Sequence, residues 1–158
     1  MSPIALNPIA QADVERILPL MAQFYAEYEY PFRPAAAGAA LETLVANEHL
    51  GRIWILEERA GAVGYVAVTF GYSLEQAGRY AVVDELYVVP DARHRGAGKR
   101  ALAFVEALCA ETGIRALNVE TEESHPGLLE FYHRHGFVDR NRRLLTKPLP
   151  ARHGDVER

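Results

Sequence analysis

Residues 84–100 constrain the fold of this chain more than any other stretch, because a strand, a loop and a helix follow one another there without a linker. The apolar and β-branched residues before Pro90 are typical of a buried strand, and Pro90 ends it. Helical spacing of apolar residues begins directly after Gly98. This arrangement predicts a domain of mixed α and β structure around one sheet.

The loop between that strand and helix is basic and contains two glycines. The first N–H groups of a helix have no partner within the helix and lie at the positive end of its dipole. Glycine removes side chains that would keep a phosphate away from these donors. The neighbouring cations are Arg93, Arg95, Lys99 and Arg100. The loop therefore predicts an anion site; the alternative is a basic turn that only caps a structural helix.

The Walker and dinucleotide-binding motifs do not fit this loop. A Walker loop requires Ser or Thr after its lysine, but Arg100 follows Lys99. The dinucleotide motif GxGxxG requires a third glycine, and Ala101 stands in its place. The glycine spacing alone leaves the ligand of the anion site open.

The other apolar patterns predict the rest of one sheet and its helices. Helical spacing covers residues 13–28, 35–48, 99–112 and 124–136, and strand-like runs cover 3–9, 52–58, 63–70, 80–89, 114–120 and 137–149. The three successive strands before residue 90 favour an antiparallel meander. We expect an α/β fold over residues 1–149, a mixed and mostly antiparallel central sheet flanked by about four helices, and a disordered tail over 150–158.

Composition and charge exclude several classes of protein. A formal charge of −4 on 158 residues argues against a protein that binds nucleic acid through its phosphates. No apolar run is long enough to span a membrane, and residues 1–20 lack the pattern of a signal peptide. The single Cys109 excludes an intrachain disulfide and a cysteine-based zinc site, and the histidines do not have the spacing of a metal site. We expect a cytoplasmic protein with no metal, nucleic-acid or membrane partner.

Two motifs resemble the GCN5-related N-acetyltransferase (GNAT) family. Residues 85–98 read ELYVVPDARHRGAG, which is similar to the family's strand E-L-x-V-x-P-x-x-R and its loop [RQ]-x-x-G-x-[GA]. Residues 131–137 read FYHRHGF, which is similar to the family's late helix ending F-Y-x-x-x-G-F. The two motifs occur in the family's order, and the resemblance covers roughly residues 4–149. His94 stands where many members have Gly, and His125 where they often have Asn.

The resemblance implies acetyl-coenzyme A as co-substrate. Its pyrophosphate is expected on the backbone N–H groups of residues 95–99, and its pantetheine arm along residues 86–89 as an added strand. A backbone N–H near Val88 is expected to stabilise the oxyanion. The residues expected to bind it are Leu86, Tyr87, Val88, Arg93, His94, Arg95, Gly96, Ala97, Gly98, Lys99 and His125.

Acetyl transfer to an amine requires a base and gains from an acid. An alkyl ammonium has a pKa near ~10.4, so a carboxylate has to remove its proton. Asp84 and Glu85 are the candidates, and they point to opposite faces of a regular strand unless a bulge disturbs it; the family motif favours Glu85. The same carboxylates could instead pair with Arg79 or Arg115. Tyr132 is expected by similarity to protonate the leaving thiolate, and without the resemblance it reads as core.

The resemblance predicts an N-acetyltransferase that acts on a primary amine by direct attack in a ternary complex. The acceptor is expected to be a small, polyamine-like amine. The alternatives are a protein lysine or N-terminus, or a non-catalytic acyl-CoA-binding module. A homodimer is compatible with the family. The aromatic residues Tyr25, Tyr28, Tyr30 and Phe32 are either core or a wall of the acceptor pocket, where they suit a cation.

Overall fold

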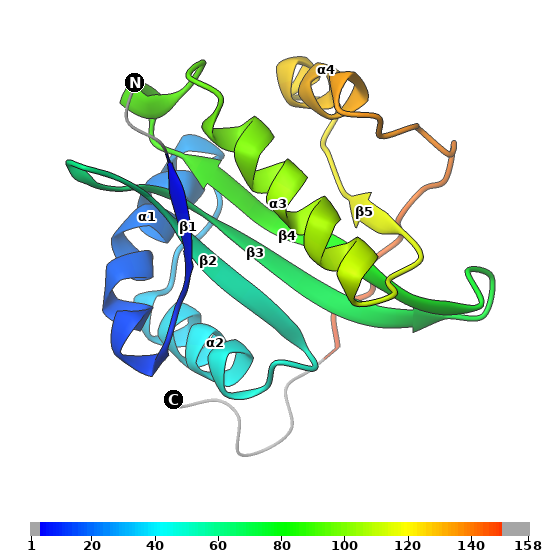
Figure 1. The fold of residues 1–158 in the computed structure, drawn as a ribbon, viewed down its shortest axis with the longest axis horizontal. Helices are drawn as coiled ribbons and strands as arrows, with labels where there is room; N and C mark the ends of the chain where they lie inside the picture. Colours follow the sequence, from blue (N-terminus) through cyan, green and yellow to red (C-terminus); the bar gives the residue numbers. More distant parts are fainter. Residues whose placement is uncertain (1–3, 150–158) are drawn as a thin grey trace. The chain divides into compact units, whose positions relative to one another are not determined.

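A computed structural model describes residues 4–149 of the chain, so the tail predicted for 150–158 lies outside the described residues. The chain divides into two compact units, residues 1–120 and 121–158. Within residues 4–149, the first unit contains one sheet and three α-helices, and the second unit contains one α-helix, α4 (Pro126–Arg134) (Figure 1). That residues 1–149 form one domain stays a prediction.

The sheet of the first unit has five strands in the order β1-β2-β3-β4-β5. They are β1 (Ala5–Pro8), β2 (Gly51–Glu58), β3 (Gly61–Ser73), β4 (Gly78–Val88) and β5 (Leu117–Val119). Strands β1 to β4 pair antiparallel, and β5 pairs parallel to β4. This confirms the predicted meander and the mixed, mostly antiparallel sheet. Strand β5 is shorter than the predicted 114–120, because it pairs only with Ala81–Val83 of β4.

Helices cover both faces of the sheet (Figure 1). Helices α1 (Val14–Glu27) and α2 (Pro34–Ala46) pack on one face, where Ile17, Ile55 and Tyr65 are fully buried. On the other face lies α3 (Ala97–Glu111), which follows β4 after a short 3-10 turn, Pro90–Ala92. Trp54 and Cys109 are buried and belong to the core. None of the helices within residues 4–149 is long and apolar enough to cross a membrane.

The prediction of a final strand within residues 137–149 is wrong. These residues have no regular secondary structure. The charged run Asp139–Arg143 folds back on itself: Asn141 has a φ of 52°, and its N–H donates to the Asp139 carboxylate at 2.7 Å. A side chain that binds its own backbone in this way competes with strand pairing. The apolar residues that suggested a strand, such as Leu144 and Leu145, are exposed.

Candidate active site

A β-bulge in β4 decides how the two candidate carboxylates are presented. Ala67 of β3 pairs with Glu85, and the next residue, Val68, pairs with Val83. Asp84 is therefore the additional residue of the bulge and has no partner on β3. The bulge breaks the alternation of a regular strand, which would have placed Asp84 and Glu85 on opposite faces. Glu85 follows Ala67 onto the face covered by α1 and α2.

Two tyrosine hydroxyls hold the half-buried carboxylate of Glu85. The hydroxyl of Tyr25 on α1 donates to Glu85 Oε1 at 2.6 Å, and the hydroxyl of Tyr65 on β3 donates to Oε2 at 2.5 Å. Tyr65 is fully buried. The sequence argument did not single out Tyr65, although a tyrosine in a buried strand generally requires a polar partner for its hydroxyl. The two bonds fix the orientation of the carboxylate before any ligand is present.

Burial sets the protonation of this cluster. Burial raises the pKa of Glu85 above its usual value; the two tyrosine hydrogen bonds lower that pKa, and the nearby charge of Asp84 raises it. The Asp84 side chain is exposed, but partial desolvation by the surrounding residues also raises its pKa. Burial and the Glu85 carboxylate raise the pKa values of Tyr25 and Tyr65, so both hydroxyls remain donors. A carboxylate with a raised pKa is a stronger base than an exposed one.

Neither carboxylate has a cationic partner within residues 4–149. The structure shows no ion pair of Asp84 or Glu85 with Arg79 or Arg115, which was the structural alternative for these acids. Instead, the guanidinium of Arg79 lies 4.9 Å from the centre of the Phe70 ring. The two carboxylates thus leave an uncompensated negative charge at the bulge, which favours a cationic ligand.

The aromatic residues at the end of α1 are continuous with this cluster. Tyr25 contacts Tyr30 at 5.9 Å and Phe32 at 5.5 Å between ring centres, both in edge-to-face geometry. Tyr28 stacks on Tyr30 at 6.0 Å. Tyr30 is partly exposed, whereas Phe32 packs against the core. The cluster is therefore both core and surface, and it reaches the Glu85 carboxylate through Tyr25.

The N-terminus of α3 presents free backbone donors. The N–H of Arg100 donates to the Gly96 carbonyl at 3.0 Å as the first helical bond, which leaves the N–H groups of Ala97, Gly98 and Lys99 without a helical partner. Gly96 has a φ of 87°, and no atom lies within 4 Å of the position a Cβ would take. This open, positively charged helix start suits the pyrophosphate of a coenzyme.

Arg93 ties the loop before α3 to the rest of the unit. Its guanidinium makes a two-pronged ion pair with Glu27 at 2.7 and 2.5 Å, and its Nε donates to the Val88 carbonyl at 2.8 Å. It also lies 5.6 Å from the centre of the Tyr87 ring. In this conformation Arg93 positions the loop, and its expected contact with a coenzyme stays a prediction. The guanidinium of Arg95 forms an ion pair with the Glu58 carboxylate at 3.5 Å.

One edge of β4 is open beside the bulge. Strand β5 pairs with β4 only as far as Val83. The N–H of Val89 donates to the Val63 carbonyl of β3 at 2.9 Å, so the alternation of the strand directs the N–H of Val88 to the opposite edge. No strand of the described chain covers that edge at residues 84–88. An extended ligand can pair there as an added strand.

The sequence profile of the acetyltransferase (GNAT) family matches residues 17–137. The chain belongs to this family. It is 28% identical over 128 residues to the uncharacterized N-acetyltransferase YhfO of Bacillus subtilis. The matched residues make up 81% of this chain and 85% of that relative. A solved integron cassette protein, HFX_CASS3, from the mobile metagenome of Cole Harbour Salt Marsh is 36% identical, with a TM-score of 0.83 over 92% of this chain and 91% of that one.

A third comparison concerns the coenzyme. The aminoglycoside N-acetyltransferase AAC(6')-Iy, solved in complex with CoA, shares the fold, with a TM-score of 0.81 at 17% identity over 94% of this chain and 96% of that one. That neighbour was solved with CoA bound. The chain is an N-acetyltransferase, and its dependence on an acyl-CoA follows from the family.

The second unit carries the other two residues expected in the GNAT site. Tyr132 is buried on α4, with its ring 5.2 Å from those of Phe131 and Phe137. His125 is the N-cap residue of α4, and its Nδ1 lies 2.9 Å from the Ser124 hydroxyl. The packing of the Tyr132 ring is typical of a core residue, and its role as a general acid stays a prediction.

Proposed function

We propose that this GNAT enzyme transfers acetyl from acetyl-CoA to a small primary amine by direct attack in a ternary complex, with Glu85 as the base. One observation carries the proposal: the Glu85 carboxylate lies between the hydroxyls of Tyr25 and Tyr65, beside the unpaired Asp84 at the bulge. A carboxylate without a cationic partner, held in one orientation and with a raised pKa, is suited to bind an ammonium and remove its proton.

The protons move between named groups of the chain. Asp84 attracts the ammonium, and Glu85 takes one proton from it, directly or through one water, so that the amine becomes nucleophilic. Tyr25 and Tyr65 keep their protons and hold the carboxylate in place. By the family resemblance alone, Tyr132 is the proposed donor of a proton to the departing thiolate. When bound, acetyl-CoA supplies the acetyl group as a thioester, whose carbon–sulfur bond breaks as the carbon–nitrogen bond forms.

The residues near β4 and α3 fit the coenzyme. The free N–H groups of Ala97, Gly98 and Lys99 would hold its pyrophosphate, with added charge from Arg95 and Lys99. The open edge of β4 would pair with its extended arm, and the N–H of Val88 is directed to that edge. A donor at this position stabilises negative charge that develops on an oxygen during the reaction.

A cationic acceptor of polyamine type is supported by charge and by aromatic surface. The two carboxylates provide negative charge, and Tyr25 links them to the partly exposed Tyr30. Ammonium groups bind to aromatic faces as well as to carboxylates. No observation favours a protein lysine or a protein N-terminus as acceptor, or a homodimer.

Release of free CoA thiol with a panel of amines tests this proposal. We expect Glu85→Gln to lower kcat/KM for the amine at neutral pH without a change in acetyl-CoA affinity, and the defect to shrink at higher pH, where more of the free amine is neutral. Asp84→Asn is the matched variant at the neighbouring acid, and we expect it to raise KM more than it lowers kcat.

Three results would contradict parts of the proposal. If Asp84→Asn shows the pH-dependent defect and Glu85→Gln does not, the base is Asp84. If neither variant shows it, the base does not lie on β4. If acetyl-CoA binds but no amine of the panel releases thiol, the proposal of a small amine as acceptor fails.

A further inference from the structure

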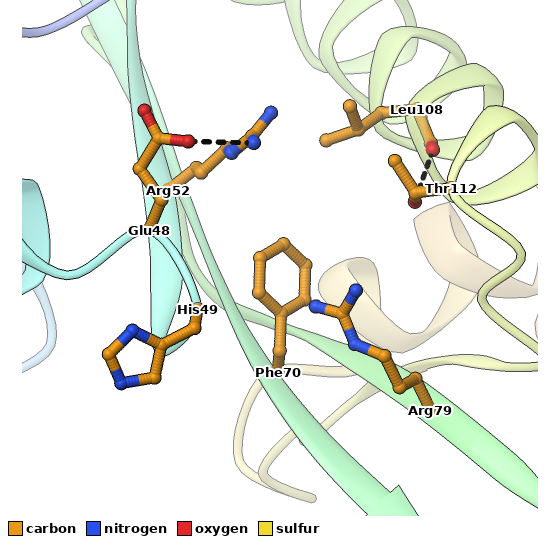
Figure 2. A pocket seen from close by; sticks show the side chains of 7 residues that line it. All are labelled: Glu48, His49, Arg52, Phe70, Arg79, Leu108 and Thr112. Carbon is orange, nitrogen blue, oxygen red and sulfur yellow. Dashed lines mark hydrogen bonds and ion pairs between the residues drawn. The ribbon is translucent and has the colours of Figure 1, made fainter.

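A hollow lies in the first unit, at the end of the sheet where β2 begins and β3 ends. Figure 2 shows its lining: Arg52 from β2, Phe70 from β3, Arg79 from β4, and Leu108 and Thr112 at the C-terminal end of α3. Its volume is about 310 Å³. The loop before β2 adds Glu48 and His49 at the edge. The proposed transferase site uses none of these residues.

The sheet register explains why two arginines converge there. Arg52 pairs with Val68, and Arg79 pairs with Tyr72, so Phe70 lies between their partners on β3 and all of them share the α3 face of the sheet. In Figure 2 the two guanidinium groups come from either side of Phe70 and point into the same space, opposite Leu108. Two cations that meet in one hollow repel each other, so an anion between them is favoured.

The positive charge is only partly compensated. Glu48 accepts a hydrogen bond from Arg52 at 2.9 Å, but the Nε of Arg52 is buried without a partner in the part of the chain that the structure describes. Arg79 forms no ion pair within residues 4–149 and packs on the Phe70 ring. Two arginines against one glutamate leave a net positive lining on a chain whose formal charge is −4.

We infer that this hollow binds a small organic oxyanion, a carboxylate or a phosphate monoester, between the guanidinium groups of Arg52 and Arg79. Planar guanidinium groups match the oxygens of both anions in two-pronged geometry. Phe70 and Leu108 provide the apolar surface for the body of such a ligand. Both kinds of ligand carry an oxyanion attached to a small apolar group.

The hollow is separate from the coenzyme site along the same strand. Arg79 is at the start of β4 and Val88 at its end. At roughly 3.3 Å per residue, these ends are separated by roughly 30 Å. An anion held between Arg52 and Arg79 therefore does not reach the N-terminus of α3, so the two sites are separable by mutation.

Titration followed by amide NMR spectra of the full chain tests this inference. The probes are phenyl phosphate, benzoate and, as an uncharged control, benzyl alcohol. We expect saturable shifts of the amides of Phe70, Leu108 and Thr112 with the anions and none with the alcohol. The tighter of the two anions identifies the phosphate or the carboxylate as the preferred group.

Variants assign the binding to the two arginines. Arg79→Gln and Arg52→Gln should each weaken the tighter anion at least about tenfold, which corresponds to about 1.4 kcal/mol. Arg59→Gln, at the exposed β2–β3 turn, removes the same charge elsewhere and should have no such effect. Arg79→Lys keeps the charge without the planar fork and should give an intermediate loss. Thermal unfolding of each variant checks that it is folded.

Other outcomes overturn the inference. Shifts confined to Gly96–Lys99, with affinity unchanged in both glutamine variants, would place the anion at the start of α3. Equal affinity for benzyl alcohol would show an apolar site with no role for the arginines. The absence of saturable binding of either anion at 10 mM, a concentration on the order of ten times a weak 1 mM Kd, would show that no oxyanion site exists.

Discussion

Replacing Tyr65 by Phe removes one hydroxyl from the site and nothing else. In the wild-type protein this buried hydroxyl donates to Glu85 Oε2 at 2.5 Å, and the bond lowers the pKa of Glu85. A hydrogen bond to a charged group contributes about 1.5–3 kcal/mol. Since one pKa unit corresponds to about 1.4 kcal/mol, Tyr65→Phe should raise the pKa of Glu85 by roughly one to two units.

Carbon NMR of the labelled glutamate carboxyl groups measures this shift directly, with Glu85→Gln to assign the resonance. If Glu85 is the base, as proposed, the acid limb of kcat/KM for the amine should move to higher pH by the same amount, because the carboxyl group has to be ionised to accept a proton. Tyr87→Phe is the matched control. Tyr87 on β4 is buried like Tyr65 on β3, and the centres of the two rings are 6.3 Å apart. The Tyr87 hydroxyl makes no hydrogen bond to Glu85.

The position of Tyr25 provides a second control. Its hydroxyl bonds to the same carboxylate at 2.6 Å but is only partly buried, so water can replace it and Tyr25→Phe should give the smaller shift. A folded Tyr65→Phe protein in which Glu85 titrates as in the wild type would refute the reasoning. It would show that the hydroxyl does not stabilise the ionised carboxylate.

Three further predictions follow from other parts of the chain. Gly98→Glu places a negative charge at the start of α3, and calorimetry should show acetyl-CoA affinity reduced at least about tenfold, or about 1.4 kcal/mol, in a folded protein; unchanged affinity would remove the coenzyme from this site. Tyr132→Phe should lower kcat by about a hundredfold with little change in acetyl-CoA affinity if Tyr132 is the acid, whereas a normal kcat under rate-limiting chemistry returns it to the core. Because the pKa of Glu85 is raised on folding, its stabilising contribution relative to Glu85→Gln is complete below the unfolded pKa and decreases as pH rises through the folded pKa; urea unfolding of both proteins from pH 4 to 8 measures the difference, and a constant difference contradicts the raised pKa.

Local patterns were sufficient to predict the segments that form the proposed coenzyme site. Pro90 ended the strand, and the predicted helix after Gly98 appears as α3. Both patterns involve residues that are close in the sequence, so they can be recognised before the fold is known.

The features that the sequence could not reveal depend on contacts between distant residues. Tyr65 acquires its role only because β3 pairs with β4 and α1 crosses the same face, which brings Tyr25 and Tyr65 to one carboxylate. The apolar residues between 137 and 149 have the composition of a strand, but a strand also requires a paired edge, and Asn141 turns back onto Asp139 instead. Composition does not reveal whether a partner strand is available.

The bulge at Asp84 accounts for two properties of the site at once. Before it, Val83 faces α3 and is the last residue of β4 that pairs with β5. After it, Glu85 faces α1 and α2, and the edge toward β5 is open. One additional residue therefore changes the face that β4 presents at the point where it loses a neighbour. The proposed base and the open edge that the proposed coenzyme arm would pair with therefore lie next to each other at the bulge.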